Sequence, residues 1–98
     1  MSAIRHVVFR GGVQGVGFRA FVEDEAVRRG VGGWVRNRRD GAVEAVFTGP
    51  ENAVREIVDV CRQGPRAARV DGVEEREAAA DELAQRGHGP AFAVLPTA

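Results

Sequence analysis

The chain has 98 residues, a length that suits one compact domain and leaves no room for a second. Its 14 basic residues, all of them arginine, balance 14 acidic residues, so the formal net charge is zero. That balance lacks the positive excess with which proteins bind nucleic acids or anionic membranes, and we expect neither partner. The hydrophobic fraction of 44% argues against a disordered chain.

Cysteine and histidine are scarce. Cys61 is the single cysteine, which excludes a disulfide within the chain and suits a reducing compartment. Together with His6 and His88 it cannot complete a structural zinc site. No apolar run reaches the ~20 residues that span a bilayer, and the first residues do not resemble a signal peptide. We expect a soluble, cytoplasmic monomer without a metal or another cofactor.

The first predicted element is a buried strand over 4–9, which is rich in β-branched and aromatic residues. The segment 11–17 follows, and four glycines in seven positions predict irregular structure there. A helix is expected over 18–29, with acidic residues in its early half and two arginines in its last turn. Gly30 is expected to end it. Its apolar residues at helical spacing are Phe18, Phe21, Val22, Ala26 and Val27.

Two strands around a turn come next. The strand at 34–37 leads into Asp40-Gly41, a strong hairpin signal, and alternation over 43–48 predicts a strand with one buried face. A second helix opens at 49–51, where Pro50 suits the first turn. A further strand is expected over about 69–76. The apolar stripe of the second helix consists of Ala53, Val54, Ile57, Val58 and Cys61.

The order strand, helix, strand, strand, helix, strand is typical of the ferredoxin-like fold. We therefore predict a single α+β domain over 1–98, a βαββαβ sandwich with two helices on one face of an antiparallel sheet. The segment 78–98 is harder to assign. Its alanine-rich start favours helix, 87–90 favours loop, and 91–95 is a candidate short edge strand.

The glycine-rich segment lies between a strand and a helix, where backbone N–H groups converge on an anion and the helix N-terminus adds positive charge. Arg19, on the first helical turn, is within reach of the same anion. The alternative is a tight turn with a solvated arginine.

The sequence does not match three other motifs that bind phosphate or RNA. The dinucleotide fingerprint lacks its acidic residue, and the P-loop needs a lysine, which this chain does not have. In an RNA-binding sheet the aromatic residues stand two apart on one strand face, whereas Phe18 and Phe21 are three apart, a helical spacing.

Two longer motifs carry a family resemblance. The run from Gly11 to Arg19, GGVQGVGFR, resembles the phosphate-binding signature of acylphosphatases. The second signature of that family resembles Gly33-Trp34-Val35-Arg36-Asn37 together with the glycines and valine that follow up to Gly49. The resemblance spans about 7–74 and implies the ferredoxin-like fold. Residues 78–98 do not follow the usual ending of the family, and Gly12 stands where many members carry arginine.

The resemblance also implies an activity, the hydrolysis of acyl phosphates to a carboxylate and inorganic phosphate. It implies that Arg19 binds the substrate phosphate and that Asn37 positions the attacking water. An amide suits that role because it offers a donor and an acceptor without becoming charged. The remaining phosphate contacts would come from the main-chain amides of Gly12, Val13, Gln14, Gly15, Val16, Gly17 and Phe18.

The expected mechanism is metal-free. A carboxylate is a good leaving group, so catalysis would rest on positioning and on stabilising the transferring phosphoryl group. Structural roles are favoured for His6, His88 and Cys61. The runner-up is a non-catalytic module that binds phosphate or carbamoyl phosphate, since similar domains occur within larger carbamoyl-transfer proteins. An RNA-binding domain is disfavoured by the neutral charge.

Overall fold

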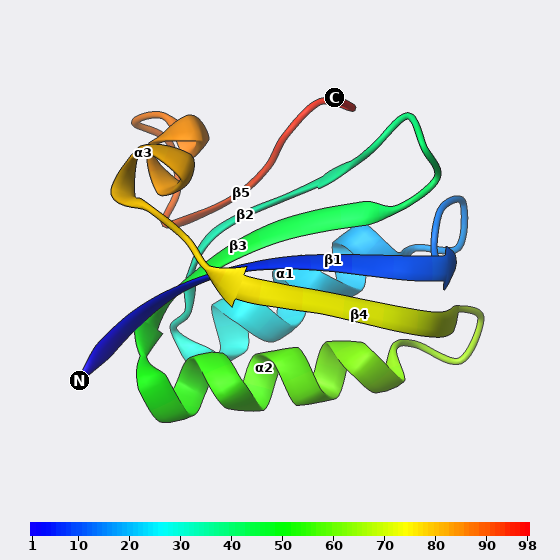
Figure 1. Ribbon diagram of the computed structural model, residues 1–98, viewed down its shortest axis with the longest axis horizontal. Coiled ribbons are helices and arrows are strands. Elements are labelled where there is room, and N and C mark those ends of the chain that lie inside the picture. The colour runs from blue at the N-terminus through cyan, green and yellow to red at the C-terminus, as the bar shows by residue number, and fades with distance from the viewer.

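The computed structural model describes residues 1–98 and contains a sheet, two long helices and a short helical connection (Figure 1). The predicted order of the first six elements is confirmed. The elements are β1 (Ser2–Gly12), α1 (Phe18–Arg29), β2 (Gly32–Asn37), β3 (Val43–Pro50), α2 (Glu51–Gln63), β4 (Arg69–Glu77), α3 (Ala80–Leu83), the 3-10 helix η1 (Ala84–Arg86) and β5 (Phe92–Val94). No helix is both long and apolar enough to cross a membrane.

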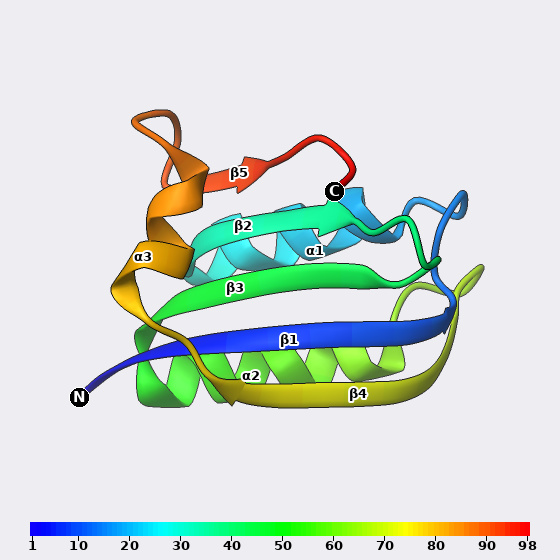
Figure 2. The same ribbon diagram turned by 45° about the horizontal axis from the view of Figure 1, so that its top comes forward.

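The sheet has the strand order β4-β1-β3-β2-β5. The pairs β1–β4, β1–β3 and β2–β3 are antiparallel, which confirms the ferredoxin-like arrangement. The short edge strand expected near 91–95 is present over Phe92–Val94, but it runs parallel to β2, so the sheet is mixed rather than antiparallel throughout. The parallel direction of β5 follows from the path of the chain between β4 and β5. The segment α3–η1 crosses one end of the sheet, where β4 ends and β2 begins, and β5 starts from that same end (Figure 2).

The main core lies between the sheet and the helices α1 and α2. Alternate residues of β3, Val43, Ala45 and Phe47, point into it and are fully buried. The sequence predicts one buried face for this strand, yet Val46 is also fully buried, on the other face. There it packs with Trp34 and Ala93, and α3 covers part of this second cluster. The indole N–H of Trp34 donates to the Glu82 carbonyl at 2.8 Å.

In helix α1, two residues differ in burial from the pattern expected from the sequence. Phe18, Val22 and Ala26 are buried as predicted, but Val27 is 66% exposed. Glu25 is buried instead and forms an ion pair with Arg29, which also contacts Glu56 of α2. The acidic residues lie beyond the first turn, so they do not act on the helix N-terminus as the sequence pattern suggests. Glu25 belongs to the contact between the two helices.

The glycine-rich segment is irregular over a shorter stretch than predicted. Gly11 and Gly12 belong to β1 and pair with β4, with an irregularity in the register between Arg10 and Gly11. Gly11 has a φ of 128°, and a Cβ at this position would collide with the carbonyl oxygen of Arg69. A glycine here therefore lets two strands approach each other closely instead of ending the strand.

Candidate active site

The loop between β1 and α1 is anchored at both ends and open in its middle. Val13 and Phe18 are each 1% exposed and pack into the main core. Between them Gly15 and Gly17 adopt left-handed conformations with φ of 76° and 78°. Nothing lies within 4 Å of where a Cβ would stand at either glycine. At these two glycines the main chain therefore faces open space with no side chain in the way.

From Gln14 onward, the backbone N–H groups of this loop have no partner in the protein. The N–H of Val13 donates to Gly11 at 3.0 Å, and the next backbone donor along the chain is Phe21, which donates to Gly17 at 3.0 Å. No N–H group from 14 to 20 donates to another protein group. Helix α1 begins inside this stretch, and its N-cap Gly17 supplies no side-chain acceptor. Converging free amides at a helix N-terminus form an anion-binding site.

A pocket of about 330 Å³ lies in front of these amides. It brings together Arg19 from the first turn of α1 and Asn37 from the end of β2. Of the other residues predicted from the sequence, Val13, Gly15, Gly17 and Phe18 line it, whereas Gly12, Gln14 and Val16 do not. The remaining lining residues are Ala20, Glu23 and Val94.

Two polar side chains of the pocket, Arg19 and Asn37, are available to a ligand. The guanidinium of Arg19 makes no ion pair and no hydrogen bond, so its charge is not neutralised within the protein. The side-chain oxygen Oδ1 of Asn37 is buried and has no hydrogen-bond partner. A buried polar atom left without a partner costs roughly 1–3 kcal/mol, and most such atoms bind water or a ligand instead.

The last residues of the chain form backbone hydrogen bonds to the end of β2, where Asn37 lies. Leu95 donates its N–H to Val35 at 2.9 Å, and Ala98 donates to the main-chain oxygen of Asn37 at 3.1 Å. The last residue of β5, Val94, lines the pocket as well. The sequence did not indicate Val94, because the edge that β5 joins depends on tertiary packing. Glu23 was also missed, although its place one helical turn after Arg19 was a usable signal.

Charged side chains beside the pocket are mutually paired. In the β2–β3 turn, the N–H of Ala42 and the nearby Arg38 and Arg10 hold the pKa of Asp40 below its usual range. Arg10 also lowers the pKa of Glu74 by a hydrogen bond of 2.7 Å. Neither Arg10 nor Arg38 lines the pocket, and Arg19 is the cation that does.

The other side chains capable of acid–base or nucleophilic chemistry lie outside this pocket. His6 contacts Glu44 at 2.6 Å, His88 is exposed near the end of the chain, and Cys61 is buried in the core. Burial raises the pKa of the Cys61 thiol to about 12. The structure contains no group of three His, Cys, Asp or Glu side chains arranged to hold a metal ion.

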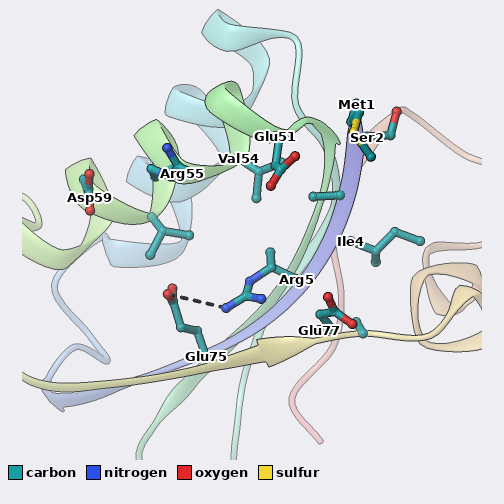
Figure 3. Close-up of a pocket in the computed structure, with 13 residues that line it drawn as sticks. Met1, Ser2, Ile4, Arg5, Glu51, Val54, Arg55, Asp59, Glu75 and Glu77 are labelled. Carbon is teal, nitrogen blue, oxygen red and sulfur yellow. Dashed lines mark ion pairs between the residues drawn. The ribbon is translucent and has the colours of Figure 1, made fainter.

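A larger pocket of about 560 Å³ opens at the opposite end of β1, between α2 and the end of β4 (Figure 3). The Arg5–Glu75 ion pair, at 3.5 Å, lies in it. Its carboxylates outnumber its arginines, so it disfavours an anionic ligand. The charged lining residues are Arg5, Arg55, Glu51, Asp59, Glu75 and Glu77.

The family model for acylphosphatases matches residues 5–87. This chain belongs to the acylphosphatase family. It is 56% identical over 95 residues to the acylphosphatase of Bradyrhizobium diazoefficiens, a match that covers 97% of this chain and 96% of that relative. The crystal structure of the Bacillus subtilis acylphosphatase superposes with a TM-score of 0.82 and 35% identity, covering 97% of this chain and 99% of the other. Acylphosphatases are hydrolases, and this chain is an enzyme of that family.

The same fold occurs inside a much larger protein. Full-length HypF, solved in a phosphate- and nucleotide-bound form, matches with a TM-score of 0.83 over 99% of this chain, but the match covers only 12% of HypF. The identity of 23% shows a shared fold and no more. The acylphosphatases, by contrast, match along nearly their whole length.

Proposed function

We propose that this enzyme hydrolyses acyl phosphates in the pocket between the β1–α1 loop and the end of β2. The observation that carries the proposal is the convergence of three unused features there: the free loop amides, the unpaired guanidinium of Arg19 and the buried Oδ1 of Asn37. Membership of the acylphosphatase family supplies the substrate class, a small molecule with a carboxyl–phosphate bond.

The phosphoryl group binds to the loop. Its oxygens accept hydrogen bonds from the free loop amides over 14–18 and from Arg19, whereas the N–H of Val13 already donates to Gly11. The planar guanidinium holds two oxygens at once, which orients the group as well as neutralising it. The positive end of α1 adds to this field. Charge that spreads over the phosphoryl oxygens in the transition state is therefore stabilised by groups already in place.

Asn37 holds the attacking water. Its Oδ1 accepts a hydrogen bond from the water and directs a lone pair of the water oxygen at phosphorus. The new P–O bond forms as the bond to the acyl oxygen breaks, and the carboxylate leaves with the electron pair. A phosphoryl oxygen takes the proton that the water gives up. Because a carboxylate is a good leaving group, no strong general acid is required, and we propose that no metal ion takes part.

The first experiment measures turnover of acetyl phosphate and benzoyl phosphate with a chelator present. Arg19→Ala and Asn37→Ala should each lower kcat/KM by on the order of 10²–10³, which corresponds to ~3–4 kcal/mol of transition-state stabilisation. Matched controls are Arg66→Ala and Asn52→Ala, which change exposed residues outside the pocket and should leave activity unchanged. Activity that vanishes with the chelator would contradict the metal-free mechanism.

The same assay separates catalysis from binding alone. A module that only binds phosphate or carbamoyl phosphate, the fold's alternative use, would bind inorganic phosphate and release no product from either substrate. We further propose that the enzyme acts in the cytoplasm, as a monomer and without nucleic acid. The single buried thiol and the zero net charge are compatible with these assignments. Fractionation of cells expressing the protein would test the compartment.

A further inference from the structure

Gln14 lies in the phosphate loop, but its side chain does not line the pocket. The half-buried carboxamide instead reaches the β2–β3 turn. Its Nε2 donates to the carbonyl of Arg38 at 2.7 Å and to the carbonyl of Ala42 at 2.9 Å. A carboxamide nitrogen carries two hydrogens, and both are used here. Both acceptors are carbonyls, so only the NH₂ end of the side chain fits this position.

The two acceptor carbonyls close the turn that follows Asn37. The N–H of Arg38 donates to the Ala42 carbonyl at 2.8 Å, and the N–H of Gly41 donates to the Arg38 carbonyl at 3.1 Å. Gln14 therefore gives each of these oxygens a second hydrogen bond. Within 13–17, no other residue makes a hydrogen bond to β2, β3 or their turn.

This contact joins the two halves of the site. The amides and Arg19 belong to the loop and α1, whereas Asn37 belongs to β2 and directly precedes Arg38. The spacing between a bound phosphoryl group and a water on Asn37 therefore depends on how the loop is attached to the turn. A misplacement of about 1 Å between reacting groups can reduce a rate by roughly 10²-fold.

We propose that Gln14 is a positioning residue that fixes the position of the phosphate loop relative to Asn37. This inference rests on the proposed function. It assigns to the Gln14 side chain a role separate from any phosphate contact by its backbone amide. Loss of the two hydrogen bonds should leave phosphate binding largely intact and impair the attack of water.

Gln14→Met tests this, because methionine keeps the length of the side chain and removes both donors. We expect kcat to fall by about 10- to 100-fold, while the inhibition constant of inorganic phosphate changes by less than about threefold. Gln14→Asn is a second variant that stays polar but is one methylene shorter. The matched control is Gln85→Met, since Gln85 also makes a side-chain hydrogen bond, to Arg36, outside the pocket. A kcat within threefold of the wild type, or equal losses of kcat and phosphate affinity, would overturn the proposal.

A double-mutant cycle distinguishes positioning from general loosening of the fold. If Gln14 acts through Asn37, Gln14→Met should change the residual kcat of Asn37→Ala by less than about threefold. Losses that multiply in the double variant would show that the two residues act independently, and the proposal would fail.

A titration with inorganic phosphate, followed by NMR, gives a readout that does not depend on turnover. In the wild type, phosphate should shift both the loop amides and the side-chain amide of Asn37. In Gln14→Met the loop amides should still shift, while the response of Asn37 is reduced. An unchanged Asn37 response would refute the role of Gln14 even if the wild type proved inactive, whereas an inactive wild type with a reduced response would refute the proposed function alone.

Discussion

At the scale of single residues, the site depends on groups that the fold leaves unused. Most arginines near the pocket are committed to carboxylates, as Arg10 and Arg38 show. Arg19 is not, and Asn37 has a buried oxygen without a partner. Leaving the buried oxygen of Asn37 unsatisfied costs stability, which a substrate or water restores on binding.

Cys61 offers a prediction at this scale. Its burial raises the pKa of the thiol to about 12, and the thiolate is the reactive form, so at pH 8 only about one molecule in 10⁴ carries it. We expect the native protein to resist alkylation by iodoacetamide at pH 8, measured by mass spectrometry. The same protein in denaturant should react fully and serves as the control. Complete labelling of the native protein at the rate of a free cysteine would contradict the burial of this residue.

At the scale of elements, three strands are joined by one cluster of charges. Glu44 of β3 contacts His6 of β1 at 2.6 Å and Arg36 of β2 at 2.8 Å. Burial pushes the pKa of Glu44 upward, but hydrogen bonds from His6 and Arg36 outweigh burial and leave the pKa below its ordinary value of 4.5. The cluster therefore links β1, β2 and β3 on the face of the sheet opposite α1 and α2.

The lowered pKa of Glu44 predicts acid sensitivity. A depressed carboxylate pKa contributes stability above the ordinary value of 4.5, and that contribution is lost as pH falls through the folded-state value. Glu44→Gln should lower the free energy of unfolding by about 1–2 kcal/mol at pH 7, with a smaller difference at pH 3. Urea unfolding at several pH values measures both. Glu77→Gln, which changes an exposed carboxylate without an ion pair, is the control, and an equal effect of Glu44→Gln at both pH values would contradict the assignment.

The fifth strand supports both the core and the site. Phe92 is 3% exposed and stacks on Phe47 with ring centroids 6.0 Å apart. Phe92→Ala should lower the free energy of unfolding by about 3 kcal/mol, and it should also reduce kcat because the segment behind Asn37 loses its anchor. Urea unfolding and the acetyl phosphate assay measure the two effects. Thr97→Ala, an exposed change in the same segment, should alter neither quantity. Full activity of Phe92→Ala would show that this segment does not support Asn37.

At the scale of the whole molecule, local signals predicted most of the fold. Glycines, the Asp40-Gly41 turn and two apolar stripes mark the first six elements within a few residues. The direction of β5 was not predictable, because it depends on the path of 78–91 around the sheet. The extension of β1 through Gly11 and Gly12 was also missed, since composition alone does not show that β4 pairs with these glycines.

The site, like the fold, has residues that the sequence predicted and residues that it did not. Arg19 and Asn37 could be proposed from sequence because each stands in a long motif, and the structure places both in one pocket. The partners of the Gln14 side chain could not, since its acceptors are main-chain carbonyls, which any residue supplies. The contribution of Val94 depends on strand pairing far along the chain.

The surface also bears on assembly. Only Met1, Val27 and Val94 are large apolar residues with substantial exposure, so little apolar area is available for a stable dimer. We expect light scattering to give a mass near 10.5 kDa at micromolar concentration. A mass near twice that value, independent of salt, would contradict the monomer.

The strand order leaves β4 as the long unpaired border of the sheet, since β5 covers the other side. An open border of this kind is a template on which further chains add, and that growth leads to fibres. Here the border carries six charged residues among nine, and Glu74, Glu75 and Glu77 are all exposed. A neighbouring molecule that tried to extend the sheet would have to strip water from these carboxylates. The charged border therefore acts against fibrillation, a protection that the family's chemistry does not itself require.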